Sequence, residues 1–346
     1  MSACKTLLCV SSLCSSFKCT HPSLPPSLPH TLSLSISLSS LGLRSTRRCY
    51  TSPQNAAVSI EEPLDEDDQS GDTVHHLLTS TEGVSTLMKM DRNPHPPLLN
   101  EPQARWFPYL DRFRCGNGYV LSSGEIIEAV SPCISEVRKQ RFRNVVRNRT
   151  YSVCLVVEGL SDLSNVSAAF RSADALGLQS VHVVSSGTNK RYKDNRHVSM
   201  GAEKWLDIEL WDSTKECFQM LKSRGYRIAT THVGMDAVPI YDLDWSCPTA
   251  IVVGNENRGI TEEALELSDL HCCIPMKGMV DSLNVSVAAA ILMHHVVCDR
   301  ISRVGRHGDL TVEQSQILLA EFSLRHSKNA ISIAQDYAKR KAAILT

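Results

Sequence analysis

Between residues 150 and 300 the sequence alternates short apolar runs with segments of helical spacing, and this alternation restricts the fold more than any other feature. The runs are β-branched and continuous: SVCLVVE (152–158), SVHVV (180–184), YRIATT (226–231), TAIVV (249–253) and HCCIP (271–275). Continuous runs of this length are expected in a parallel sheet that is covered on both faces. Helices are predicted in the intervening and following segments 165–176, 213–223, 261–268 and 284–300. The predicted fold class is therefore α/β, a mostly parallel sheet with helices on both faces.

Helices are also predicted on both sides of this core. Ser131 precedes a proline, which is typical of a helix start, and apolar residues then recur at helical spacing to about Arg149. After the core, Thr311 and Gln314 have the spacing of a capping box, and a further helix is predicted over 328–341. We therefore expect N- and C-terminal helices to flank the α/β core.

The first fifty residues have the composition of an organelle transit peptide. They contain five basic residues, 13 serines and no Asp or Glu, although the whole chain carries 37 acidic residues. A secretory signal needs a continuous apolar block, and LSLSISLSSL is interrupted at every second residue. We therefore predict a transit peptide over 1–52 and an organellar location, with an ordinary disordered tail as the alternative. The serine richness favours a chloroplast, whereas RRCYTS around 47–52 is compatible with a mitochondrial cleavage site.

Residues 53–104 are predicted to form an acidic, disordered linker. Residues 51–104 carry ten acidic residues against Lys89 and Arg92, and they include the proline-rich RNPHPPLLNEP. A segment of this composition buries little apolar surface. Folded protein is therefore expected from about Arg105 onward.

The sequence disfavours membrane and metal chemistry. No run approaches the roughly 18 consecutive apolar residues that a membrane-spanning helix needs. The eight cysteines that follow the predicted transit peptide contain no C-x-x-C pair, which argues against a zinc site or a disulfide framework. His294 and His295 are neighbours, and adjacent residues on a helix do not face one ligand from the same side. We expect neither a metal nor membrane association.

Three loops follow predicted strands at their carboxyl ends, where an open parallel sheet binds its ligands. In the first, LSNVSAAFRSADALG, Asn165 is expected to open a helix that Gly177 ends, and Arg171 lies six residues after Asn165. Long side chains on a helix lean towards its N-terminus, so Arg171 could reach an anion bound near that end. The alternative is that Arg171 only pairs with Asp174 and that Asn165 is only a helix cap.

The second loop, VVGNENRGIT, joins a strand to a helix through a glycine-rich turn. Gly254 and Gly259 have the spacing of a Walker A loop, but Ile260 stands where the phosphate-binding lysine would be. An enzyme that depends on a nucleoside triphosphate is therefore disfavoured. What remains is a turn that presents Glu256 and Arg258 to solvent, with a tight connection of no function as the alternative.

The third loop, IPMKGMVDSLNVSVAAAILMHHVV (274–297), leads into a helix that begins at Asn284. This helix is apolar and small on nearly every side, so we expect it to be buried, in part against a second subunit. Ser282 and Asn284 are the polar residues at the N-terminal end of this helix.

Together and in this order, the three loops resemble motifs one, two and three of the SpoU (TrmH-like) family of SPOUT methyltransferases. The matching patterns are N-x-x-A-x-x-R-(S/T)-A-D, then G-N-E-x-x-G, then I-P-M-x-G-x-x-x-S-L-N-V-S-V-A. The resemblance extends to GAEKWLD (201–207), DAVPIYDLDW (236–245) and HGDLTVEQ, and so covers roughly 120–340. It is closest to the branch that methylates the 2'-oxygen of guanosine 18 in tRNA.

The resemblance implies a fold and a set of site residues. It implies a sheet whose C-terminal part is tied in a trefoil knot, in an obligate dimer that binds S-adenosylmethionine in the knot and uses no metal. Carried over to this sequence, the cofactor contacts, largely through backbone groups, are Gly254, Glu256, Ile274, Met276, Ser282, Leu283 and Asn284. The implied catalytic residues are Asn165, Arg171, Glu256, Ser282 and Asn284.

Methyl transfer from a sulfonium to a ribose hydroxyl needs a polarised oxygen and a positioned donor. The resemblance assigns the base role to Arg171, yet arginine normally stays protonated. Two roles therefore stay open: Arg171 takes the proton, or it stays cationic, anchors a substrate phosphate and stabilises the forming alkoxide. Asn165 is expected to hold Arg171 in place, and Asn284 to support the cofactor loop.

RNA binding requires a positive surface, and two clusters of basic residues are candidates for it. The first cluster is Arg138, Lys139, Arg141, Arg143, Arg147 and Arg149, and the second is Lys190, Arg191, Lys193 and Arg196. An ordinary solvated helix face is the alternative for the first. The predicted organisation is a helical RNA-binding extension over 105–150, a SPOUT methyltransferase domain over 151–303 and a C-terminal helical extension over 304–346.

The sequence thus predicts an organellar, dimeric methyltransferase that acts on guanosine 18 of tRNA. Ribosomal RNA is the near alternative, because the same motifs serve both substrates. From another class, a catalytically silent RNA-binding protein is disfavoured because the residues named above for catalysis are intact.

Overall fold

The computed structural model describes residues 88–93, 105–115, 118–159, 162–184, 196–255 and 257–345. All of these belong to one of two compact units, which spans Asp65–Thr346. The predicted transit peptide and most of the predicted linker lie outside the described residues.

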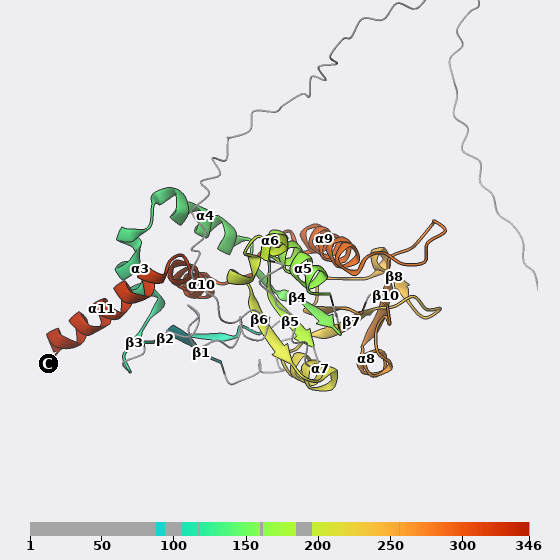
Figure 1. The fold of residues 1–346 in the computed structure, drawn as a ribbon, viewed down its shortest axis with the longest axis horizontal. Helices are drawn as coiled ribbons and strands as arrows, with labels where there is room; N and C mark the ends of the chain where they lie inside the picture. The colour runs from blue at the N-terminus through green and yellow to red at the C-terminus, as the bar shows by residue number, and fades with distance from the viewer. Residues whose placement is uncertain are drawn as a thin grey trace, which may run out of the picture. The chain divides into compact units, whose positions relative to one another are not determined.

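The described residues form a seven-stranded sheet in which every pair of neighbouring strands is parallel (Figure 1). Its order is β6-β5-β4-β9-β7-β10-β8. The strands are β4 (Thr150–Glu158), β5 (Leu178–Val184), β6 (Asp207–Trp211), β7 (Arg227–Thr231), β8 (Val238–Pro239), β9 (Thr249–Val253) and β10 (Leu270–Cys273). The five predicted strands are confirmed, and β6 and β8 are the additional strands at the two edges.

Helices cover both faces of this sheet, as the continuous apolar strands predict (Figure 1). On one face, α5 (Leu163–Ala175) and α9 (Val285–Val304) pack against odd-numbered residues of β4 such as Leu155. On the other face, α7 (Thr214–Ser223) and α8 (Glu262–Leu267) pack against even-numbered residues such as Val156. All nine residues of β4 are buried, because this strand lies in the interior of the sheet between two apolar layers.

The helix that carries the first motif begins earlier than the sequence predicts. Asp162 is the N-cap of α5 and accepts a hydrogen bond from the backbone N–H of Ser164 over 2.8 Å. The prediction that Asn165 opens this helix is therefore wrong: Asn165 lies in the first turn, and its side chain is not needed as a cap. The predicted end is confirmed, since Gly177 follows the helix at φ +80°, in the left-handed region that glycine adopts readily.

A second hydrophobic core lies in the flanking segments. A three-stranded antiparallel sheet, β1 (Met88–Arg92), β2 (Tyr109–Cys115) and β3 (Val120–Leu121), packs there with the helices α3 (Ser123–Val130), α4 (Glu136–Arg147), α10 (Val312–Arg325) and α11 (Lys328–Leu345). The helices predicted after residue 304 are confirmed, including the capping box of Thr311 and Gln314. The extension predicted to be helical over 105–150 contains α3 and α4 but also the strands β2 and β3, which were not predicted, and β1 lies within the range predicted to be a disordered linker.

The helix predicted to start at Ser131 is divided in two. Residues Ser131–Cys133 form a short 3-10 turn, and α4 begins only at Glu136, with Ser135 as its N-cap. Short elements also occur in the core, namely α6 (Arg196–Ser199), a 3-10 turn at Ala202–Lys204 and another at Ile240–Asp242. The trefoil knot stays a prediction.

Candidate functional site

The three loops singled out by the sequence follow β4, β9 and β10 at the carboxyl edge of the parallel sheet (Figure 1). β4 and β9 are neighbours, and β10 is separated from β9 only by β7. Because every strand runs in the same direction, all three loops emerge on one edge. The topology therefore gathers the loops into one region, as the sequence predicts.

Asn165 and Asn284 join the first loop to the third. The side-chain amide of Asn284 donates from Nδ2 to Oδ1 of Asn165 over 3.1 Å, although the residues are 119 positions apart. Asn284 is the N-cap of α9, so its Oδ1 accepts from the backbone N–H of Ser286 over 2.9 Å. That capping bond fixes which end of the amide faces the helix and leaves Nδ2 for Asn165, which is only 9% exposed.

Arg171 lies on α5 with an exposed side chain. The ion pair with Asp174 that would have given it a purely structural role is not formed. Instead, the carboxylate of Asp174 pairs with the guanidinium of Arg149. Within the described part of the chain, the guanidinium of Arg171 makes no ion pair, so it is available to a ligand at this edge of the sheet.

The turn of the second loop is closed by its own backbone. The N–H of Asn255 donates to the carbonyl of Gly259 over 2.9 Å, and the N–H of Gly259 donates back over 2.8 Å. A Cβ at Gly254 would lie 2.5 Å from the carbonyl oxygen of Gly259, and so only glycine permits this approach. Arg258 is exposed as predicted. Glu256 lies outside the described residues.

The segment between β10 and α9 presents its backbone to a ligand. Ile274 and Met276 are half-buried, whereas Ser282 and Leu283 are exposed. Among the described residues, no backbone hydrogen bond is recorded for residues 276–283. The N–H and C=O groups of this segment are therefore available as donors and acceptors, the property that a cofactor held largely by backbone contacts requires.

Only one face of α9 is buried in this chain. Its inner face, which includes Ala289, Leu292 and Val296, packs into the core against the sheet. Its outer face leaves apolar side chains exposed, and these are Val287 at 47%, Ile291 at 36%, Ile301 at 48% and Val304 at 46%. The prediction that α9 is buried is confirmed for its inner face, and burial of its outer face against a second subunit stays a prediction. By length and composition alone α9 also qualifies as a membrane span, but a helix whose inner face packs in a soluble core passes the same test.

Comparisons with known proteins agree with this geometry. The profile of the SpoU rRNA methylase family matches residues 152–294. The chain is 35% identical over 168 residues to the tRNA (guanosine(18)-2'-O)-methyltransferase of Thermus thermophilus, covering 48% of this chain and 85% of that protein. The Escherichia coli enzyme of the same name is 35% identical over 161 residues, covering 46% of this chain and 69% of that protein.

The crystal structure of the A. aeolicus TrmH/SpoU tRNA modifying enzyme superposes with a TM-score of 0.50 at 31% identity, covering 54% of this chain and 95% of that chain. This chain belongs to the SpoU family. The resemblance in the three motifs is thereby confirmed.

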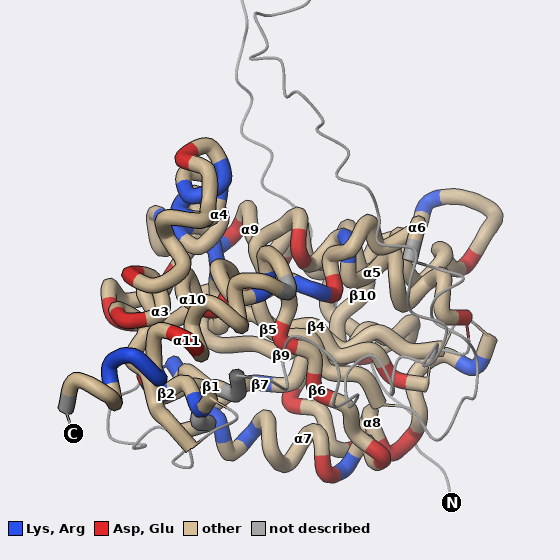
Figure 2. The backbone as a smooth tube through the Cα atoms, turned by 60° about the vertical axis from the view of Figure 1, so that its left-hand side comes forward, with Lys and Arg blue, Asp and Glu red and all other residues tan. Residues whose placement is uncertain are grey.

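Outside the SpoU core, α4 carries most of the first basic cluster (Figure 2). Arg141 and Arg147 are exposed. Lys139 and Arg143 pair with Glu136 over 3.1 and 3.4 Å, but these contacts are solvent-exposed and contribute little stability. The guanidinium of Arg138 stacks over the ring of Phe142 at 5.4 Å.

Arg149 does not belong to this surface. It follows the end of α4, is 1% exposed, and donates to the backbone carbonyls of Asp174 and Leu178 over 3.2 and 3.1 Å. The prediction that Arg149 contacts RNA is wrong, because its guanidinium joins the N-terminal extension to the SpoU core. In the second cluster, Lys190, Arg191 and Lys193 lie outside the described residues, as does the side chain of Arg196.

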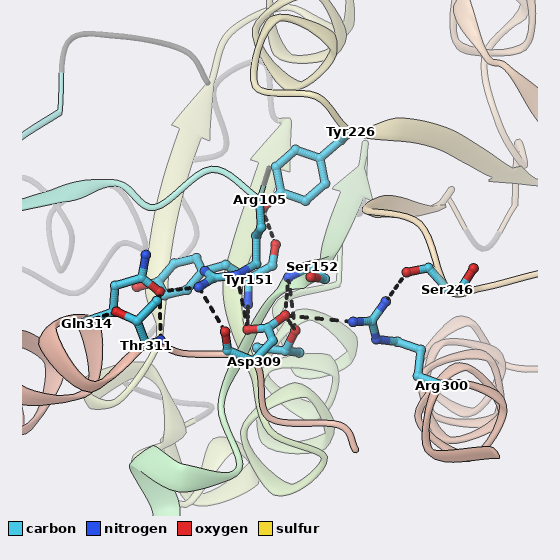
Figure 3. Close-up of polar contacts among 10 residues, drawn as sticks. Arg105, Tyr151, Ser152, Tyr226, Ser246, Arg300, Asp309, Thr311 and Gln314 are labelled. Carbon is cyan, nitrogen blue, oxygen red and sulfur yellow. Dashed lines mark hydrogen bonds and ion pairs between the residues drawn. The ribbon is translucent and has the colours of Figure 1, made fainter. Parts of the chain in front are cut away.

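Asp309 fixes the flanking extensions to the start of β4 (Figure 3). Its carboxylate accepts from the hydroxyl of Thr150 and from the N–H of Ser152, the latter over 3.2 Å. It also pairs with Arg105 at 3.3 Å and with Arg300 at 3.8 Å. This junction, which the sequence reasoning did not identify, holds the segment that carries α4 in a fixed place relative to the amino end of β4.

The thiols buried in the SpoU core are poor candidates for chemistry. All eight cysteines of the described residues are free, and burial raises the pKa of Cys272 to about 12. Burial likewise raises the pKa of Cys154 and of Cys217. These thiols stay protonated near neutral pH and are poor nucleophiles. In the described ranges, no group of three or more His, Cys, Asp or Glu residues could hold a metal ion.

Proposed function

We propose that this protein is an S-adenosylmethionine-dependent methyltransferase that modifies the 2'-hydroxyl of guanosine 18 in tRNA. The observation that carries the proposal is the hydrogen bond between Asn165 and Asn284, which joins the first motif, with its exposed Arg171, to the third motif. The Thermus thermophilus and Escherichia coli relatives are named as methyltransferases of this nucleotide. A catalytically silent protein would not need this arrangement.

The residues at the carboxyl edge fit the cofactor. The proposed contacts are Gly254, Glu256, Ile274, Met276, Ser282, Leu283 and Asn284. When bound, S-adenosylmethionine supplies a methyl group on a positively charged sulfur, which a ribose oxygen attacks in line. The free backbone groups of residues 276–283 would bind its polar atoms, and the closed turn at Gly254 leaves no side chain in the way.

The chain's own polar side chains would activate the substrate hydroxyl. Arg171 is exposed, which favours its role as an anchor for a phosphate and as a stabiliser of the forming alkoxide. Removal of the proton by Arg171 stays the alternative. Asn165, held by Asn284, would fix the first turn of α5, the helix that also carries Arg171, and Ser282 and Glu256 complete the proposed catalytic set.

The basic face of α4 is the proposed tRNA contact. It consists of Arg138, Lys139, Arg141, Arg143 and Arg147, and Lys190, Arg191, Lys193 and Arg196 are proposed as a second contact. Phosphate contacts of this kind supply most of the affinity and little of the sequence preference. Selection of guanosine 18 would therefore rest on the site at the sheet edge.

The active form is proposed to be a homodimer. The exposed apolar side chains of α9 recur at positions 287, 291 and 301, on one side of the helix. Apolar side chains gathered on one side of an exposed helix often mark a surface that a protein partner covers. A second copy would cover it and would enclose the adjoining segment 276–283. The proposed location is an organelle, a chloroplast or a mitochondrion, reached through a transit peptide over residues 1–52.

Ribosomal RNA is the second candidate substrate, because the matching family is described as the SpoU rRNA methylase family. The test is methyl transfer by the full-length protein from labelled S-adenosylmethionine to unmodified tRNA and, in parallel, to ribosomal RNA, with the product mapped to the nucleotide. We expect label in tRNA at guanosine 18. Label in ribosomal RNA alone would establish the second candidate, and RNA binding without transfer to either would establish a silent binder.

A further inference from the structure

A buried carboxylate lies beside the proposed site and has no role in the reaction described above. Glu158 is the last residue of β4 and is 2% exposed. Among the described residues, no cation pairs with it. Its carboxylate instead accepts three hydrogen bonds, from Oγ1 of Thr214 over 2.8 Å, from Oγ1 of Thr261 over 2.6 Å and from the N–H of Thr261 over 3.2 Å.

A carboxylate in an apolar layer is costly unless its oxygens are hydrogen-bonded. The three hydrogen bonds offset this cost and tie Glu158 to two other segments of the chain. Two of them go to Thr261, the N-cap of α8, which ends the turn of the second motif. The third hydrogen bond comes from the hydroxyl of Thr214, in the first turn of α7.

The start of the same turn is hydrogen-bonded to Gly159, the residue that follows Glu158. Asn255 donates from Nδ2 to the carbonyl of Gly159 over 2.8 Å, and the Oδ1 of Asn255 accepts from the N–H of Asn257 over 2.8 Å. The first and last residues of the turn, Asn255 and Thr261, are therefore hydrogen-bonded to two consecutive residues, Gly159 and Glu158. The turn is closed by its own backbone hydrogen bonds. The two attachments therefore fix the position of the whole turn relative to the end of β4.

We propose that Glu158 is a positioning residue for cofactor binding: it holds Thr261, and with it the turn of the second motif, in the place where Gly254 can contact S-adenosylmethionine. This inference rests on the proposed function. Glu158 does not touch the cofactor in this account; it acts through Thr261. The turn follows β9 and the first motif follows β4. Since these strands are neighbours in the sheet, Glu158 and Gly159 at the end of β4 connect the turn to the start of the first motif.

The test compares affinities of the full-length protein for S-adenosylmethionine, measured by calorimetry. Glu158→Gln keeps the volume but replaces one acceptor oxygen by an amide NH2, which faces donors. We expect the Kd for the cofactor to rise about tenfold or more, while the Kd for tRNA stays unchanged. The matched control is Glu321→Gln, which alters another buried carboxylate, paired with Arg325 in α10, and should leave both affinities unchanged.

A second pair of variants covers the case in which Glu158→Gln does not fold. Thr261→Ser keeps the hydroxyl that bonds Glu158, and Thr261→Val removes it. We expect the serine variant to retain the wild-type Kd and the valine variant to lose affinity. Equal cofactor affinity in wild type, Glu158→Gln and Thr261→Val would overturn the positioning role. A wild-type protein that does not bind S-adenosylmethionine at all would instead overturn the proposed function itself.

Discussion

Asn284 donates a hydrogen bond to Asn165 over 3.1 Å and so connects the cap of α9 to the first turn of α5. The two helices pack side by side on one face of the sheet (Figure 1). One side-chain contact thus links the segment that carries Arg171 to the segment proposed to hold the cofactor.

This contact predicts coupled losses of activity. Asn165→Ala and Asn284→Ala should each lower kcat/KM for methyl transfer, because each leaves the other amide unpaired. In the double variant the losses should not add, with a coupling energy of about 1 kcal/mol. Steady-state kinetics on the four proteins measures this. Strictly additive losses would show that the two amides act independently.

Arg171→Ala should abolish turnover without weakening cofactor binding. The reason is that Arg171 is exposed, unpaired among the described residues, and placed to act on the substrate rather than on the cofactor. Turnover is followed with labelled S-adenosylmethionine, and cofactor affinity by calorimetry. Near-normal turnover in this variant would remove Arg171 from the catalytic set.

Two arginines that are close in sequence should behave in opposite ways. Arg141→Ala should weaken tRNA binding and reduce the salt dependence of log Kd by about one unit of slope, with unchanged stability. Arg149→Ala should instead lower the free energy of unfolding by roughly 3 kcal/mol, because it breaks a buried ion pair with Asp174. Filter binding across salt concentrations and denaturant unfolding give the two readouts. If the Arg149→Ala protein were as stable as the wild type but bound tRNA more weakly, Arg149 would contact RNA after all.

The outer face of α9 should decide the oligomeric state. Ile291→Asp places a charge in the exposed apolar stripe, which a second copy would have to bury. We expect sedimentation to show a dimer for the wild type and a folded monomer for the variant. Gln219→Asp, exposed on α7 at the opposite face of the sheet, is the control for an added charge. A variant that remains dimeric would place the interface elsewhere.

The strands of the core could be predicted because they are continuous apolar runs, and the edge strand β6 could not, because DIELW interrupts its apolar residues with charge. β2 has a period of two, with Phe113 and Cys115 buried and Arg112 and Arg114 exposed. That alternation was a usable signal for a half-exposed strand.

The side-chain partners were harder to predict than the elements. The sequence places Asn165 at the start of a helix, with a plain helix cap as the alternative, but Asp162 is the cap and Asn165 bonds Asn284. Arg149 was grouped with α4 because sequence spacing does not reveal where a helix ends. Glu158 has a visible signal, since it is a charged residue at the end of an apolar strand, but its three donors come from distant segments.

The central claim is that the acceptor is the 2'-oxygen of guanosine 18, and one substituted substrate tests it most directly. The full-length protein is incubated with labelled S-adenosylmethionine and either a tRNA with a ribose at guanosine 18 or the same tRNA with a single 2'-deoxyguanosine at that position. We predict label in the first and none in the second, although both should bind equally. Equal labelling of the two tRNAs would contradict the account.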